Sequence, residues 1–419
     1  MRSALLSWLF LVRLSALRGL GLVSACSVAA AVFATTQRGA PWRGDLVWTI
    51  DWLSVGFVIC GPLVAGAAAL DVGRMARSTL HLEGIWPWRS PGLGVAIGHA
   101  SLACIGHLVG LAAALIMSLP PVGDPFAWLA VLVQLLLLVL FVSLGAAVGR
   151  LTQPVLAGLV ASSAVLLLIY FFGSPSDQIT ILNMGQATLP RIGYAYHWTY
   201  LAAQAVIIVV LIVALWILRP ASPTGSRHVG WGRMLVSVVL VVASVGLGLA
   251  TTLSRLVPTG RPPTYCGAVQ TRPVCYYPEH ARVSDGFSET LWAIVEMTEH
   301  SDYRGLLPQR FAEVSQTWAP TDPETAPFVL GDEQLTGGPP DVTAILQGIV
   351  EPVHCAQLAT DALPSERYGV DLQGLVSTWE SVVTEDTSML VGDPMSAEEA
   401  LALRDQFATC SYPYFTEPS

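Results

Sequence analysis

The chain has 419 residues, of which 53% are hydrophobic and only 12% charged, and its formal net charge is −9. A single water-soluble domain does not need so much apolar sequence to fill its core, so the composition excludes an ordinary soluble protein and indicates a membrane protein with several spans. All 21 basic residues are arginine, and without lysine the chain cannot by itself be a Walker-type ATPase, whose phosphate-binding loop requires that residue.

The charge divides the chain into two parts. Residues 262–419 hold 24 of the 30 acidic residues but only 6 of the 21 arginines, a net charge of −18, which leaves +9 for residues 1–261. Such a contrast indicates that the two parts meet different solvents.

The N-terminal segment is amphipathic. We expect residues 4–17 to form an interfacial helix, with Trp8 and Phe10 as membrane anchors, or else to extend the first span. A cleaved signal peptide is not expected, because Arg18 leaves only seven apolar residues before Cys26.

Seven apolar stretches approach the roughly 20 residues that a bilayer span requires. They cover residues 19–36, 47–70, 93–118, 125–148, 153–173, 198–218 and 234–256. Ten arginines flank these spans on one side, against three in the short loops of the other side (Arg38, Arg43 and Arg191). The positive-inside bias predicts a cytoplasmic N-terminus and, after seven spans, an extracytoplasmic C-terminal region.

A short charged segment, residues 71–88, follows the second span. It combines polar groups with an apolar stripe that includes Met75, Leu80, Leu82 and Ile85; the polar residues are Asp71, Arg74, Arg77 and Glu83. On the cytoplasmic side this pattern fits either a turn that rests on the lipid surface or an amphipathic helix that docks into a partner protein.

Two further connections are predicted in the membrane region. Residues 173–198 are too apolar for a solvated loop and too rich in Pro and Gly for a span, which favours a short helical hairpin in the outer leaflet. Residues 219–233 have the composition of a cytoplasmic linker.

The acidic C-terminal region is predicted to be mainly α-helical. Apolar residues recur at helical spacing, and Ser396 with Glu399 forms a capping box before an apolar helix. The apolar positions are Leu291, Trp292, Val295, Ile345, Leu346, Ile349 and Val353.

Four of the seven cysteines lie in this acidic region, and an even number in a non-cytoplasmic segment favours two disulfides. Three pairings are possible. The nine-residue interval between Cys266 and Cys275 suits a local loop closure, which leaves Cys355 to pair with Cys410.

Ionisable residues within the apolar stretches are the candidates for a translocation pathway. His99 and His107 are eight residues apart in the third span, on broadly the same helical face, and Asp51 lies near the outer end of the second. Histidines hydrogen-bonded to neighbouring helices would explain the same pattern. The spacing predicts no metal site, and no basic patch indicates nucleic acid.

Three features of the membrane region occur in a recognisable order. They are the amphipathic entry segment, the second span, which ends in "GPLVAGAAALDVGRMARS" and continues to "LEGIWPWRSPG", and four further spans with an outer hairpin before the sixth. In these features, residues 1 to about 220 resemble the type-2 ABC export permeases of high-GC Gram-positive bacteria. The C-terminal region, with "CGAVQTRPVCYYPEH", is similar to extracytoplasmic extensions of some actinobacterial permeases.

The resemblance implies an all-α polytopic fold in which successive parts of the chain have separate roles. Residues 1–220 would form a six-span permease domain, 221–233 a linker, 234–256 a seventh span and 257–419 the extracytoplasmic domain. The segment matching 71–88 would be a coupling helix moved by a separate ATPase subunit, which binds ATP and Mg²⁺. A second permease subunit, identical or different, would complete the pathway for a peptide, drug-like or lipid-like cargo.

Two alternatives remain open. The spans could anchor a non-transporting envelope receptor or scaffold that presents the C-terminal domain. An intramembrane enzyme could use His99 and His107.

Overall fold

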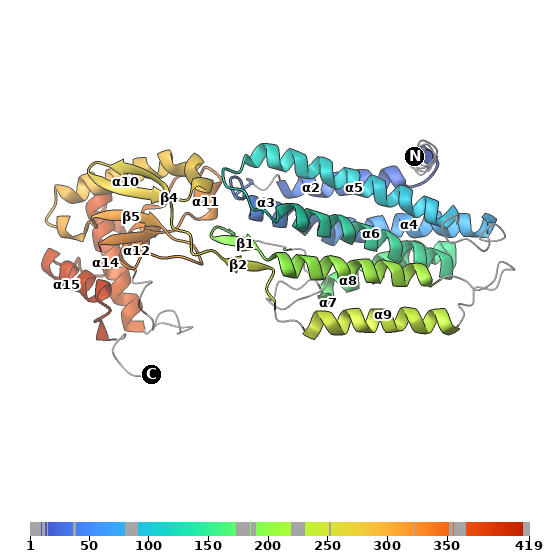
Figure 1. Cartoon of the computed structure of the whole chain (residues 1–419). Coiled ribbons are helices and arrows are strands. Elements are labelled where there is room, and N and C mark those ends of the chain that lie inside the picture. Colours follow the sequence, from blue (N-terminus) through green and yellow to red (C-terminus); the bar gives the residue numbers. More distant parts are fainter. Residues whose placement is uncertain are drawn as a thin grey trace.

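The structure is a computed structural model that describes residues 10, 13–14, 16–36, 39–79, 91–172, 185, 190–218, 231–250, 253–322, 324–351, 355 and 366–413. It has two parts, an elongated bundle of apolar helices and a C-terminal domain that sits at one end of it (Figure 1). We call that end of the bundle the domain end, and the opposite end the far end.

The bundle helices lie at the predicted apolar stretches. They are α2 (Gly21–Thr36), α3 (Leu46–Leu53), α4 (Phe57–Thr79), α5 (Pro91–Ser118), α6 (Ala127–Leu151), α7 (Pro154–Phe172), α8 (Trp198–Ile217) and α9 (Trp231–Ala250). A short 3₁₀ helix, η1 (Ser54–Gly56), joins α3 to α4, and we call residues 46–79 the rod.

Four helical segments are long and apolar enough to cross a membrane: Leu46–Met75, Gly92–Ser118, Ala127–Leu151 and Trp198–Ile217. Three other apolar helices in the described part of the chain are shorter, at Gly21–Thr36, Val155–Phe171 and Trp231–Ser244. The chain is therefore a helical membrane protein, and the count of seven spans stays a prediction.

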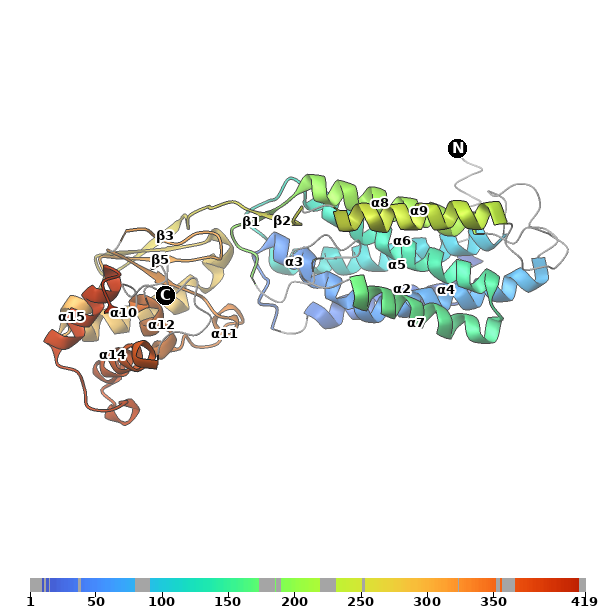
Figure 2. The same ribbon diagram turned by 90° about the horizontal axis from the view of Figure 1, so that it is seen from below.

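The rod is the central element of the bundle. Helix α4 packs against α2, α5, α6 and α7, whereas α9 packs mainly on α8 (Figure 2). Its approach to α6 is unusually close, because a Cβ atom added at Gly145 would lie 2.2 Å from the carbonyl oxygen of Ala65, and one at Gly149 would lie 2.4 Å from that of Ala69. The "GAAVG" sequence of α6 is thus a small-xxx-small contact of the kind that joins membrane helices.

The rod also corrects one prediction. We expected the second span to end near Leu70 and to be followed by either a turn on the lipid surface or an amphipathic helix, but α4 continues without a break to Thr79. The charged residues Asp71 and Arg74 therefore belong to the C-terminal part of α4. Helix α4 reaches the far end of the bundle (Figure 1). Residues 71–79 contain no proline, and the single glycine, Gly73, weakens a helix without ending it, so the helix can continue. Leu80, Leu82, Glu83 and the rest of the predicted coupling segment lie outside the described residues.

Most of the N-terminal helix, of the outer hairpin and of the linker also lies outside the described residues. The described end of the hairpin forms strand β1 (Tyr194–Tyr196), which pairs antiparallel with β2 (Leu256–Pro258) after α9. This two-stranded sheet, which the sequence did not predict, joins the entry of α8 to the exit of α9.

The C-terminal domain combines helices with a sheet. Its strands β3 (Tyr265–Val269), β4 (Arg272–Tyr276), β5 (Arg310–Glu313) and β6 (Thr325–Phe328) lie in that order, β3 antiparallel to β4 and the others parallel. The helices are α10 (Ser284–Glu299), α11 (Asp332–Leu335), α12 (Val342–Val350), α14 (Glu366–Thr384) and α15 (Ala397–Ala408).

More residues of this domain lie in helices than in strands, but the prediction of a mainly α-helical domain missed the sheet. Strands of four or five residues show too little alternation to stand out, and the parallel pairs depend on contacts distant in sequence. The capping box of Ser396 and Glu399 at the start of α15 is confirmed.

Both predicted disulfides are confirmed. Cys266 and Cys275 face each other on β3 and β4, with an S–S distance of 2.12 Å, and Cys355 is bonded to Cys410 at 1.98 Å. The second bond ties α15 to the segment after α12, across 55 residues of sequence.

The α4–α6 contact yields the first prediction. Gly145→Ala should lower the free energy of unfolding by about 1–3 kcal/mol, because the added methyl group must push the two backbones apart. Gly246→Ala on α9 is the matched control, since nothing lies within 4 Å of its added Cβ atom. It should be neutral or stabilise by about 0.5–1 kcal/mol through helix propensity. Thermal unfolding of the two purified variants in one detergent measures the difference, and equal stabilities would contradict the close contact.

Candidate functional site

Among the described polar side chains inside the apolar bundle, three groups along the rod contain predicted site residues. Such groups are costly at membrane depth and usually serve a function, so they define the candidate site. The first lies at the far end around Asp71, the second lies midway around His107, and the third lies at the domain end around Asp51.

The far-end group joins three helices. His99 of α5 is fully buried, and its Nε2 atom lies 3.0 Å from Oδ2 of Asp71 on α4. Its other ring nitrogen, Nδ1, lies 3.1 Å from the hydroxyl oxygen of Ser24 on α2. Asp71 also accepts the backbone N–H of Leu20 at the start of α2, where a carboxylate is favoured by the helix dipole. The group thus ties the end of α4 to α2 and α5.

The structure therefore brings together two residues that we had assigned to different roles. Asp71 was predicted to couple to a partner and His99 to line a pathway, yet they bind each other. Ser24 was missed, although a serine within an apolar helix is the signal that could have found it. The order Asp71, His99, Ser24 matches that of a hydrolase triad, but Ser24 is only 1% exposed and also donates to the carbonyl of Leu20. We interpret the group as a link between helices.

The predicted coupling residues at the far end differ in exposure. The side chain of Arg74 is 65% exposed and lies 3.7 Å from Asp71, one turn away on α4. Met75 packs against the core of the bundle, and Arg77 belongs to the last turns of α4. The far end of the central helix consequently presents an exposed positive charge.

The second group consists of His107 and Gln134. Nε2 of His107 lies 2.9 Å from Oε1 of Gln134 on α6, and Nε2 of Gln134 donates to the carbonyl oxygen of Ile50, also at 2.9 Å. His99 and His107 therefore have separate partners and do not form one site. Within the described residues, no group of three His, Cys, Asp or Glu side chains could hold a metal ion.

The third group contains a buried ion pair at the domain end. Nη2 of Arg255 lies 2.8 Å from Oδ1 of Asp51, and the two side chains are 5% and 1% exposed. The hydroxyl group of Tyr196, on β1, donates to the same carboxylate oxygen at 2.8 Å, and the guanidinium of Arg255 lies over the Tyr196 ring. Gln204 of α8 also contacts Arg255. This group holds the rod, α8 and the chain after α9 together.

Arg255 was not among the predicted site residues. Its signal was present, because it is a single arginine at the end of a long apolar stretch. Its partner is 204 residues away in the sequence, however, so only the fold identifies Asp51.

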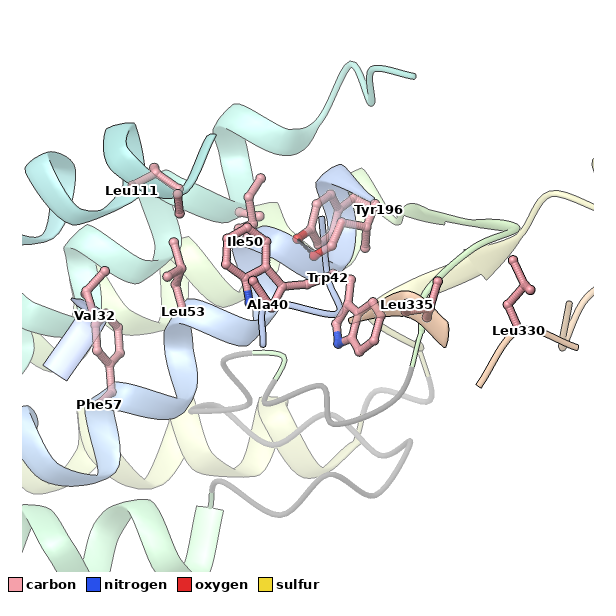
Figure 3. Packing of buried hydrophobic residues seen from close by; sticks show 14 of the residues in the cluster. Val32, Ala40, Trp42, Ile50, Leu53, Phe57, Leu111, Tyr196, Leu330 and Leu335 are labelled. Carbon is pink, nitrogen blue, oxygen red and sulfur yellow. Dashed lines mark hydrogen bonds between the residues drawn. The ribbon is translucent and has the colours of Figure 1, made fainter. Parts of the chain in front are cut away.

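The C-terminal domain is attached to the loop before α3. The guanidinium of Arg282 donates to the carbonyl oxygens of Pro41, Arg43 and Leu335, the last at 2.6 Å, so one side chain joins the loop to α11. Figure 3 shows Ala40 and Trp42 of this loop between the bundle and Leu335, and all three residues are buried.

Asp45 is the most perturbed acid at this junction. It caps α3 by accepting the N–H of Trp48 at 3.0 Å, and it accepts the N–H of Arg191 at 3.1 Å. Burial, with a smaller contribution from the nearby charge of Glu279, raises the pKa of Asp45 to about 6, although both hydrogen bonds act in the opposite direction.

No family model, curated protein or solved structure matches this chain.

The buried ion pair yields a stability prediction. Asp51→Asn should destabilise the bundle by about 3–5 kcal/mol, because it leaves the charge of Arg255 buried without its counter-ion. The double variant Asp51→Leu with Arg255→Met should recover most of this loss, since neither charge remains. Glu299→Gln, which breaks the partly exposed pair with Arg272, is the control and should cost at most about 1 kcal/mol. Thermal or denaturant unfolding in detergent measures all three, and a double variant no better than Asp51→Asn would contradict the pairing.

Asp45 yields a pH prediction. Its pKa is higher in the folded protein than the ordinary value of 3.8, so the folded state binds the proton more tightly. The stability of the junction is then highest below about pH 4 and falls until the pH passes about 6. Between pH 5 and pH 7.5 the loss should be about 1 kcal/mol.

Hydrogen exchange of backbone amides 39–45, corrected for intrinsic rates, measures this opening. Asp45→Asn should make the corrected exchange rates of these amides independent of pH. A pH dependence that is unchanged in Asp45→Asn would assign it to another group.

Proposed function

We propose that this chain is the membrane subunit of an ATP-driven exporter, moved by a separate ATPase that binds at the far end of the bundle. The observation that carries the proposal is the position of Arg74 and Asp71 at the end of the central helix. Helix α4 packs against four other helices, and Asp71 adds polar links to α2 and α5. A displacement applied there would reach the whole bundle.

The sequence supports the other parts of the proposal. With no lysine, the chain has no Walker loop of its own, so the nucleotide would be bound and hydrolysed by the partner. The arginine bias would place the far end in the cytoplasm and the disulfide-bonded C-terminal domain outside. A second permease subunit would complete the pathway, as the resemblance to type-2 ABC export permeases implies, and the cargo would be peptide, drug-like or lipid-like.

The attachment of the C-terminal domain favours a second candidate. Arg282 and the mostly buried loop 39–45 fix this domain to the bundle, as suits a non-transporting receptor or scaffold that presents a binding domain at a set distance from the membrane.

Co-purification from native membranes separates the two functions. An exporter subunit should bring down a lysine-containing protein with ATPase activity. Arg74→Glu should reduce its recovery about tenfold, because a positive charge is replaced by a negative one at the contact. Arg233→Glu is the matched control, since Arg233 is an exposed arginine near the start of α9. A receptor or scaffold would bring down no ATPase, and equal losses in both variants would contradict the proposed docking position.

A further inference from the structure

A cavity of about 490 Å³ lies where the C-terminal domain meets the chain before β1, and none of the predicted site residues lines it. Its volume is within the range of small-molecule sites, roughly 300–1,000 Å³. Its apolar lining includes Ile192, Val329 and Leu330. Its polar lining includes His280, Glu313 and Asp332.

His280 and Glu313 form a fixed pair at this cavity. Both side chains are 3% exposed, and Nδ1 of His280 bonds to Oε1 of Glu313. The other carboxylate oxygen of Glu313 accepts the backbone N–H of Tyr277 at 2.8 Å. Since a carboxylate only accepts hydrogen bonds, the proton of a neutral His280 must be on Nδ1, and Nε2 is left as an acceptor.

That Nε2 atom is buried and has no hydrogen-bond partner among the described residues. A buried polar atom without a partner is costly, and it is a common mark of a site that a ligand completes. A ligand that donates an N–H or O–H group would satisfy it.

The charge of the cavity indicates whether a ligand that donates this hydrogen bond should be an anion or a cation. Glu313 and Asp332 are both acids, so beside a neutral His280 the polar lining of the cavity is negative. An anion would be repelled, whereas a cation is favoured by both carboxylates. The apolar lining adds a surface against which a hydrophobic part of the ligand can pack.

We propose that this cavity binds a small amphipathic cation, an organic amine whose ammonium group faces His280 and Asp332 while its apolar body lies against Ile192, Val329 and Leu330. The proposal is independent of the exporter function and holds equally for a receptor.

The probe is 2-phenylethylamine, and its control is 3-phenylpropionate, which has a similar ring and chain but a negative head group. Saturation-transfer NMR on the full chain in nanodiscs, with empty nanodiscs as reference, should detect the amine and not the carboxylate. Asp332→Asn should weaken the amine about tenfold through the lost charge. Asp393→Asn, an exposed acid of the same domain that does not line the cavity, should leave the affinity unchanged.

Val329→Trp supplies a second test, because the side chain of Val329 is 68% exposed and a large ring there fills the cavity without disturbing the core. It should abolish the signal of the amine. Equal binding of the two probes, no binding of the amine at millimolar concentration, or an affinity unchanged in both Asp332→Asn and Val329→Trp would overturn the proposal.

Discussion

The close contact between α4 and α6 is the constraint on which the bundle depends. Between apolar helices in a membrane, burial of apolar surface gives little net gain, and association depends on close packing and polar contacts. Gly145 and Gly149 let the α6 backbone reach the carbonyl oxygens of Ala65 and Ala69. Any larger side chain at these positions would separate the two helices. Because α4 also packs against α2, α5 and α7, the position of the rod fixes that of most other helices.

The polar groups act at the two ends of this rod. At the far end, Asp71 links it to α2 and α5; at the domain end, Asp51 links it to Arg255 and the chain after α9. The rod begins directly after Asp45, which is the last residue of the loop that Arg282 joins to the C-terminal domain. One continuous element therefore connects the proposed docking position of the ATPase with the C-terminal domain, close to the proposed amine site.

Local patterns predicted much of this structure. Seven long apolar stretches predicted where the bundle helices lie. The nine-residue interval between Cys266 and Cys275 predicted the first disulfide, and Cys355 and Cys410 were paired because they were the two cysteines of that region that remained. The GAAVG contact could have been predicted in the same way. The ion pair of Asp51 and Arg255 could not be predicted, because its two residues are 204 positions apart and the sequence around either residue does not identify the other.

The other differences between prediction and structure have a related cause. Asp71 and His99 were given separate roles because the sequence orders them in different segments, while the fold places them 3.0 Å apart. The four-stranded sheet was missed because β5 and β6 each have four residues, too few to show an alternating pattern. The helix that ends at Thr79 was predicted to stop earlier because a change in polarity at Asp71 was taken as a change in structure.

If the proposed ATPase binds at the far end, the rod should move as one body when that subunit changes state. Spin labels at Leu70→Cys toward the far end and Val58→Cys near the domain end of α4 test this, because neither change removes the docking charge of Arg74. Each is paired with a label at Val238→Cys on α9, and a third variant carries the labels at Leu70 and Val58 together. Cys26, Cys60 and Cys104 are replaced by alanine in every variant, since these are the unpaired cysteines. Distances are measured by pulsed electron resonance, with the co-purified ATPase nucleotide-free and nucleotide-trapped. Both distances to α9 should change together, while the separation between Leu70 and Val58 stays constant. A change at Leu70 without one at Val58, or no change at either position, would contradict the account.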